Sequence, residues 1–218
     1  MANVGYSVNK SLHEFDQGDL ISAMIHACNA VDGTSKKSFP EMHKHGKRFT
    51  RLLRESYAIL GPFGIPGIDL VNTRWPVDVG SHVPDKLPDA ADVIYGIHRC
   101  IHNHGEDMPD GFELVRCANG ASIDATTVIS KGRVRLPDNI IFGLLAVAIT
   151  SPKNSSQIAD DSCYLTFRDR RFAVNDLWGQ RDELISILSE YKLPVLRIDF
   201  AHMMDLHSVD QGTSLKKT

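Results

Sequence analysis

The sequence lacks the features that would place the protein outside the ordinary globular class. It has only four cysteines in 218 residues, and no two of them form a C-x-x-C pair. Neither a disulfide scaffold nor a zinc ribbon is therefore indicated. The longest apolar run, residues 140–149, is shorter than the roughly 20 residues that cross a bilayer. The first ten residues also lack the pattern of a signal peptide. These absences predict a cytoplasmic protein with reduced thiols and no membrane partner.

Neither sign of charge dominates the composition. Lysine and arginine total 24, aspartate and glutamate total 27, and the net charge is -3 with neutral histidine. Hydrophobic residues make up 42% and charged residues 23%, which is typical of a soluble globular chain. The balance excludes a disordered or collagen-like chain and does not by itself indicate a coat of nucleic acid.

The first half of the chain predicts helices. Apolar residues recur at three- and four-residue steps within 8–37, with Gly33 near the expected end, and Leu12 and Phe15 suggest a short helix or turn before Gly18. Another helix is expected from Lys47 onward. Residues 89–104 form a third, with Asp89 as its N-cap. The glycine- and proline-rich stretch between the last two, 61–88, predicts an irregular connection.

The second half mixes helix and strand. We expect strands at 112–117, 128–136 and 195–200, a buried helix at 139–150, a hairpin centred on 168–170 and an amphipathic helix at 180–191. The sequence therefore predicts two parts. Residues 1–108 form a helical domain, and residues 109–218 form a small α+β extension whose role the sequence does not indicate.

The densest group of polar residues lies at the end of the helix predicted over 89–104. Arg99, His102 and Asn103 share one face of that helix, and His104 is its last residue before Gly105. An arginine stabilises a pentavalent phosphorane through paired hydrogen bonds, and a histidine transfers protons near neutral pH. The combination is suited to cleaving a phosphodiester without a metal or a cofactor.

The stretch from Tyr95 to Gly105 resembles the signature helix of HEPN domains, which are helical bundles that often act as ribonucleases. Their motif is an arginine, four to six residues and a histidine near the end of a helix. Arg99 and His104 match it with four residues between them. Cys100 departs from the polar residue, often asparagine, that commonly follows the arginine. Glu106 occupies the place where some toxin members carry a tyrosine that a partner antitoxin modifies.

The resemblance implies a mainly α, HEPN-like bundle over residues 1–108 and a homodimer with RNA as its partner. It implies a metal-independent endoribonuclease of a toxin or defence type, in which the RNA 2′-hydroxyl attacks the adjacent phosphate. Arg99 would stabilise the phosphorane, His104 would act as acid and base, and Asn103 and His102 would position the RNA. No cofactor is expected, and a regulatory protein is a further expected partner. The alternatives are an inactive HEPN-like module that binds RNA or a protein, and a helical interaction domain of another family.

Residues 36–54 form a basic segment in an otherwise slightly acidic chain. Seven lysines and arginines stand there against one acid, Glu41. Such an excess needs either a polyanion or acids from elsewhere in the fold. The first case predicts a track for RNA phosphates, made by Lys47, Arg48, Arg51 and Arg54. The second predicts a solvated face with internal ion pairs.

Two simpler interpretations apply to the polar group around Arg99. Arg99 fits equally well as the partner of an acid in the first helices, such as Asp32. His98 and His102 have the i, i+4 spacing found in zinc sites, but no H-E-x-x-H pattern and no clear third ligand accompany them. The sequence therefore predicts no metal site.

Overall fold

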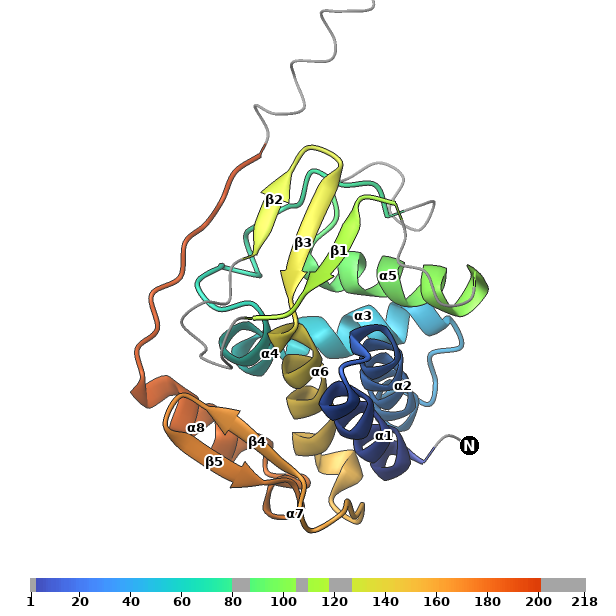
Figure 1. The fold of residues 1–218 in the computed structure, drawn as a ribbon, viewed down its shortest axis with the longest axis vertical. Coiled ribbons are helices and arrows are strands. Elements are labelled where there is room, and N and C mark those ends of the chain that lie inside the picture. Colours follow the sequence, from blue (N-terminus) through green and yellow to red (C-terminus); the bar gives the residue numbers. More distant parts are fainter. Residues whose placement is uncertain (1–2, 80–86, 105–109, 118–126, 201–218) are drawn as a thin grey trace, which may run out of the picture.

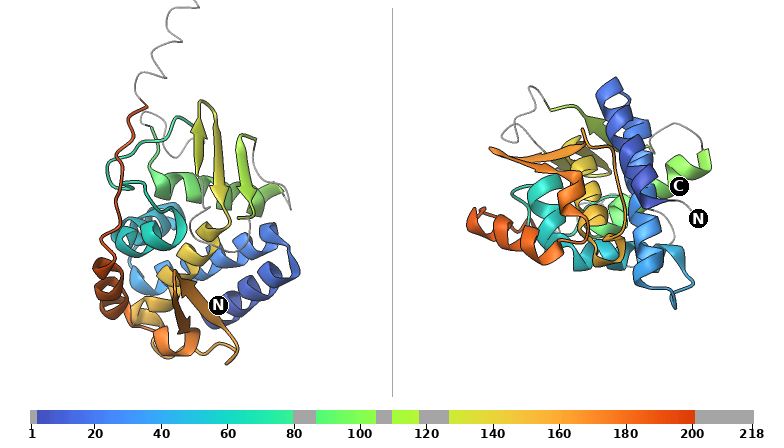
Figure 2. Two further views of the ribbon diagram at one scale, coloured as in Figure 1. Left: turned by 60° about the vertical axis from the view of Figure 1, so that its left-hand side comes forward. Right: turned by 90° about the horizontal axis from the view of Figure 1, so that it is seen from below.

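The computed structural model describes residues 3–79, 87–104, 110–117 and 127–200, and for residues 99–104 only the main chain. The described fold is mainly α, as predicted, with a three-stranded sheet at one end and a two-stranded hairpin at the other (Figures 1 and 2). The helices are α1 (Val4–Gln17), α2 (Leu20–Ser38), α3 (His45–Glu55), α4 (Tyr57–Gly64), α5 (Ala90–His104), α6 (Asn139–Thr150), α7 (Val174–Leu177) and α8 (Arg181–Glu190). The strands are β1 (Phe112–Val115), β2 (Val128–Ser130), β3 (Arg133–Pro137), β4 (Tyr164–Phe167) and β5 (Arg170–Ala173).

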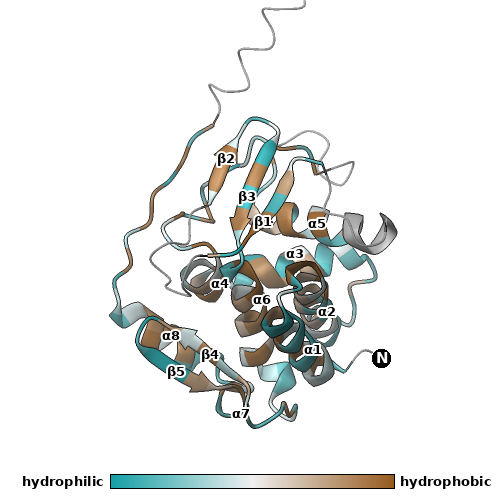
Figure 3. Cartoon of the chain, viewed as in Figure 1, coloured by the Kyte–Doolittle hydropathy of each residue, from teal (hydrophilic) through white to brown (hydrophobic). Residues whose placement is uncertain are grey.

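Helix α6 is the centre of the core. Ten of its twelve residues are buried, and it packs against α2 and α4 (Figure 3). An apolar stretch without an amphipathic period is typical of a helix enclosed on all sides, so the predicted buried helix is confirmed. The domain boundary predicted near residue 108 falls among residues outside the description. Helix α6, which follows that boundary, shares one core with helices that precede it.

Two glycines bring α4 and α6 close together. A Cβ atom added to Gly143 would lie 2.8 Å from the Cα atom of Gly64, closer than real Cβ contacts come. The absence of side chains at these two positions therefore lets the two helices cross in contact. Sequence reasoning missed α4, because Gly61, Pro62 and Gly64 suggested an irregular connection.

The predicted helix over 8–37 is two helices. Gly18 adopts φ = 89° and ends α1, and the Asp19 side chain then accepts a hydrogen bond from the Ser22 main-chain N–H to cap α2. The expectation that Gly33 helps to end the second part is wrong. Helix α2 continues past it to Ser38, because Thr34 and Ser35 are buried in its packed face.

Helix α5 begins as predicted. The Asp89 carboxylate accepts a hydrogen bond from the Asp92 main-chain N–H at 3.0 Å, and Asp92 accepts one from the Asp89 N–H at 3.3 Å. This reciprocal pair is a capping box, and it confirms Asp89 as the N-cap. The Arg54 guanidinium on α3 bonds both carboxylates, at 2.6 and 2.7 Å.

The strands confirm most of the predicted β structure. Strand β3 pairs in parallel with β1 and antiparallel with β2, around a turn in which Gly132 adopts φ = 69°. Strands β4 and β5 form the predicted hairpin. The strand predicted at 195–200 is wrong, because only one bridge, between Ile68 and Leu196, forms there. Among the helices described, none combines the length and apolar character needed to cross a bilayer.

Candidate functional site

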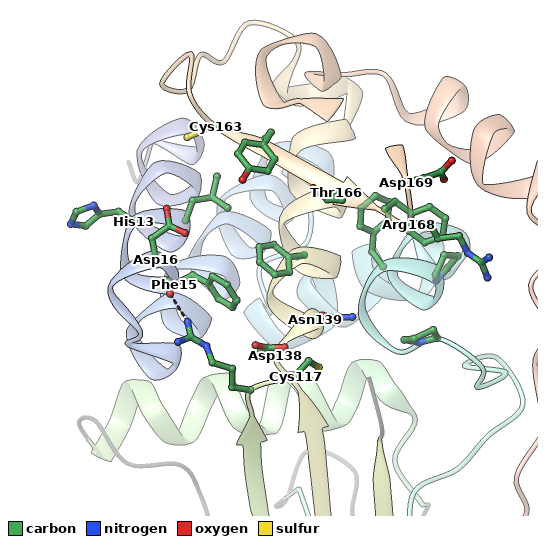
Figure 4. Close-up of a pocket in the computed structure, with 18 of the residues that line it drawn as sticks. His13, Phe15, Asp16, Cys117, Asp138, Asn139, Cys163, Thr166, Arg168 and Asp169 are labelled. Carbon is green, nitrogen blue, oxygen red and sulfur yellow. Dashed lines mark hydrogen bonds between the residues drawn. The ribbon is translucent and has the colours of Figure 1, made fainter. Parts of the chain in front are cut away.

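A cleft of about 1270 Å³ lies among α1, the start of α6, the end of β1 and the β4–β5 hairpin (Figure 4). Its lining comes from segments far apart in the chain. Figure 4 places His13 and Asp16 at one end of the cleft and Arg168 and Asp169 at the other.

One face of α1 forms the first wall. Asn9, His13 and Asp16 line the cleft at positions three or four residues apart, so they project from the same side of the helix. Asn9 joins this wall to the loop before β4. Its amide oxygen accepts a hydrogen bond from the Asp160 N–H at 3.1 Å, and its amide nitrogen donates to the Asp160 carboxylate at 3.4 Å.

Aromatic rings give the cleft an apolar floor, made by Phe15, Phe63 and Phe142. Phe15 and Phe142 meet edge to face with ring centroids 4.6 Å apart, and Phe63 lies 5.0 Å from Phe167 of β4. Aromatic rings contribute a large apolar area with few rotatable bonds, so this floor is suited to the apolar part of an organic molecule.

Arg116 lies just after β1 and crosses to α1. Its Nη2 atom donates a hydrogen bond to the Phe15 main-chain carbonyl at 2.9 Å, and its guanidinium carbon lies 5.2 Å from the centroid of the Phe15 ring. The carbonyl belongs to the last turn of α1, where it also accepts a hydrogen bond from the Gly18 main-chain N–H at 3.0 Å. Arg116 therefore adds a second donor at the helix end and contacts the aromatic floor.

Two cysteines line the cleft, and both are held as thiols. Burial and the neighbouring Asp138 carboxylate, which the thiol contacts, raise the pKa of Cys117 to about 11. Burial, followed by the charges of Asp160 and Asp16, raises the pKa of Cys163. The thiolate is the reactive form of cysteine, so neither residue is an activated nucleophile at neutral pH.

The hairpin turn forms the opposite wall. Arg168 adopts φ = 54°, a conformation that is uncommon for residues other than glycine, and its guanidinium lies over the Tyr191 ring at 5.4 Å. Asp169 accepts a hydrogen bond from the Tyr191 hydroxyl at 3.4 Å. A strained main chain next to a cavity is a frequent property of binding sites.

The four predicted catalytic residues lie in the last part of α5. The main chain of Arg99, His102, Asn103 and His104 is helical, and His104 is the final residue of α5, as the sequence predicts. Their side chains, and Gly105, lie outside the described atoms. Their proposed roles therefore stay predictions.

The predicted phosphate track on α3 makes contacts within the fold. Arg48 is 5% exposed and bonds Asp32 at 3.2 Å, Arg51 bonds Glu55 at 2.8 Å, and Arg54 bonds Asp89 and Asp92. Lys47 is exposed and has no ion pair among the described residues. Much of the local positive charge is thus balanced by acids of the fold, as the alternative interpretation expects. Asp32, considered as a partner for Arg99, has Arg48 as its partner.

The sequence reasoning missed the cleft. Its most polar members are Asp16, Arg116, Asp138, Asp160 and Arg168. No motif joins them, and the spacing along α1 is the one signal that a sequence pattern carries. Across the described residues, no group of three histidines, cysteines or acids is placed to hold a metal ion.

Comparison with known proteins assigns the chain to a family. The model of the Rv1289 family matches residues 3–204. The chain is 38% identical over 202 residues to the uncharacterized protein Rv1289 of Mycobacterium tuberculosis and to the uncharacterized protein Mb1320 of Mycobacterium bovis, with 92% of this chain and 95% of each relative covered. The chain therefore belongs to the Rv1289 family. No solved structure matches it.

The predicted membership of the HEPN family is wrong. The family match extends through both the helical first half and the mixed second half, whereas the HEPN resemblance depended on a short motif at the end of one helix. An arginine and a histidine at that spacing recur by chance in a chain that contains ten histidines, which is why the motif misled.

Proposed function

We propose that the protein binds a small amphipathic organic molecule in the cleft between α1 and the β4–β5 hairpin. One observation carries this proposal: a cavity of about 1270 Å³ has an aromatic floor and is surrounded by charged and polar side chains. Ligand sites are typically apolar cavities of about 300–1,000 Å³ with a few polar groups that fix orientation. This cleft has the lining of such a site and is somewhat larger than that range, so it has room for an organic molecule of this size.

The chemistry of the lining favours binding over covalent catalysis. The two thiols in the cleft have raised pKa values, so nucleophilic attack by a thiolate is disfavoured. The walls are joined by side-chain hydrogen bonds, from Asn9 to Asp160 and from Arg116 to Phe15. A cavity held open in this way loses little free energy to reorganisation when a ligand enters.

The proposal is tested with an uncharged fluorescent dye, N-phenyl-1-naphthylamine, whose emission rises in apolar sites. Ser162 and Thr166 line the cleft and are exposed, so replacing both with tryptophan reduces the space in the cleft without disturbing the core. We expect the Ser162→Trp/Thr166→Trp variant to bind the dye about tenfold more weakly than the wild type.

The matched control is Val128→Trp/Ser130→Trp, which places two tryptophans on β2, outside the cleft. It should bind the dye like the wild type. Equal weakening in both variants, or no saturable binding by the wild type, would contradict the proposed function.

Cleavage of RNA is a second candidate. One observation supports it: α5 continues to His104, so the main chain holds Arg99 and His104 within the end of one helix, and α5 packs against the basic helix α3. An arginine and a histidine so placed have the chemistry for attack by a 2′-hydroxyl on the adjacent phosphate. Because the chain does not belong to the HEPN family, this candidate function depends on Arg99 and His104 alone.

The test of this candidate is incubation of the purified protein with RNA in excess EDTA. Cleavage that persists in EDTA and is lost in His104→Ala would support it. Intact RNA, or cleavage that His104→Ala retains, would end it. Light scattering tests the homodimer that the same candidate expects, since a strict monomer cannot assemble a site across a two-fold axis.

A further inference from the structure

The charges around the cleft are unequal. Four aspartates line it against two arginines, so its formal charge is negative. Arg116 contacts Phe15 of α1, whereas Arg168 lies in the hairpin turn next to Asp169 (Figure 4). The excess of negative charge is therefore greatest at the end formed by α1.

Both arginines are engaged by groups of the protein. Arg116 contacts the Phe15 carbonyl and ring, and Arg168 lies over Tyr191. An anionic ligand would have to compete with these contacts and would meet the repulsion of the aspartates. The cleft is thus poorly arranged for a carboxylate or a phosphate.

Asp16 differs from the other three aspartates. Asp160 is bonded by Asn9, Asp169 by Tyr191, and the Asp138 carboxylate contacts the Cys117 thiol. Asp16 is exposed, has no hydrogen bond or ion pair among the described residues, and faces the cleft from α1 in Figure 4. A carboxylate at the edge of an apolar cavity is a ready partner for a cation.

The neighbouring Cys163 thiol lies in the same negative electrostatic field. Burial, and after it the charges of Asp160 and Asp16, raise the pKa of Cys163, which lines the same end of the cleft. A negative potential that opposes formation of a thiolate also favours a cation at that place.

We infer that the ligand of the cleft is an organic amine, an ammonium group on an apolar body, with Asp16 as its counter-charge and the aromatic floor of Phe15, Phe63 and Phe142 as the support of its body. This inference rests on the proposed function and names the class of ligand. An ammonium group brings an opposite charge as well as several hydrogen-bond donors to a carboxylate, whereas an alcohol brings one donor without the charge and a carboxylate brings neither.

The test compares three ligands that share one chain and differ in the head group: dodecylammonium, dodecanol and dodecanoate, the two ions below their micelle concentrations and the alcohol below its solubility limit. Displacement of bound N-phenyl-1-naphthylamine measures their affinities at one ionic strength. We expect dodecylammonium to bind about tenfold more tightly than dodecanol, and dodecanoate to bind most weakly.

Asp16→Asn is the decisive variant, with Asp182→Asn on the exposed side of α8 as its control. Asp16→Asn should lose about three- to fivefold in dodecylammonium affinity and keep its affinity for dodecanol. Asp182→Asn should change neither value. Circular dichroism of each variant checks that the fold is retained.

The results of these binding experiments distinguish the proposed function from the inference about the class of ligand. If dodecanol and dodecanoate bind as tightly as the amine, or Asp16→Asn leaves amine affinity unchanged, the inference fails while the proposed function stands. If the dye and all three ligands fail to bind the wild type, the proposed function fails and the inference with it.

Discussion

The Arg116 guanidinium donates a hydrogen bond to the main-chain carbonyl of Phe15, at 2.9 Å, and so joins the end of β1 to the last turn of α1. These residues are 101 positions apart in the sequence. Arg116→Met keeps the aliphatic part of the side chain and removes the guanidinium with its donors. We expect it to lower the free energy of unfolding by about 0.5–1.5 kcal/mol, measured by urea denaturation. Arg133→Met, at an exposed arginine of β3, should change it by no more than about 0.5 kcal/mol. Equal losses in the two variants would show that the bond to Phe15 contributes nothing.

The crossing of α4 and α6 gives a second prediction. Gly143→Ala would push a methyl group into the Gly64 main chain, so we expect a loss of about 1–3 kcal/mol in the free energy of unfolding. Gly61→Ala, in α4, is the control because, apart from its chain neighbours, its Cβ would meet only Leu70, at 3.8 Å. That change should alter the free energy of unfolding by no more than about 1 kcal/mol, because the better helix propensity of alanine is offset by the contact of its Cβ with the Pro62 ring. A Gly143→Ala variant as stable as the wild type would contradict the close crossing.

The basic residues of α3 should differ in how much they contribute to stability, according to the contacts that each makes. Arg54 joins α3 to both acids of the α5 capping box, although its own side chain is 42% exposed. Arg54→Met should therefore lower the midpoint of thermal unfolding, by an amount equivalent to about 1–2 kcal/mol after solvent screening is considered. Lys47→Met, on the same helix, should leave the midpoint nearly unchanged, since Lys47 has no described ion pair. Equal midpoints of thermal unfolding in the two variants would show that the ion pairs of Arg54 do not stabilise the fold.

The Cys117 thiol offers a prediction about pH. Its pKa is raised to about 11, so the thiolate that reacts with iodoacetamide is scarce at pH 8, and labelling should accelerate about tenfold per pH unit up to that value. Asp138→Asn removes the negative charge that helps to raise the pKa. It should lower the pKa of Cys117 and speed labelling at pH 8, as followed by mass spectrometry of the peptide. Labelling of Cys117 that is already at its maximum rate at pH 8 would contradict the assigned environment.

The elements that the sequence predicts best are those whose signal is local. Helix α6 follows from an uninterrupted apolar run, and α5 follows from an acidic cap and an apolar stripe. Helix α4 could not be predicted in the same way, because its glycines serve a contact with α6 that becomes visible only in three dimensions. The strand expected at 195–200 failed for the related reason that no neighbouring strand lies beside it in the described fold.

The cleft could not be predicted because its parts meet only through tertiary packing. Asp16 belongs to the first helix, Arg116 to the end of β1 and Arg168 to a hairpin turn near the other end of the chain. Each has an ordinary local explanation, as a helix-surface acid, a strand-end cation or a turn residue. In contrast, Arg99 and His104 drew attention because they are neighbours in sequence, which is a weaker guide to a site than proximity in space.

The central claim is that a ligand binds in the cleft between α1 and the β4–β5 hairpin, and locating the bound ligand tests that claim most directly. Two-dimensional NMR of the ¹⁵N-labelled protein, titrated with dodecylammonium, reports which main-chain amides change their environment. We expect saturable shifts concentrated on Asp16, Phe142 and Thr166, with none on the distant strand β2. In the Ser162→Trp/Thr166→Trp variant the shifts of Asp16 and Phe142 should need about tenfold more ligand to saturate. Shifts that instead gather on β2 or on α5, or that grow linearly without saturation across the surface, would contradict the assignment of the cleft as the binding site.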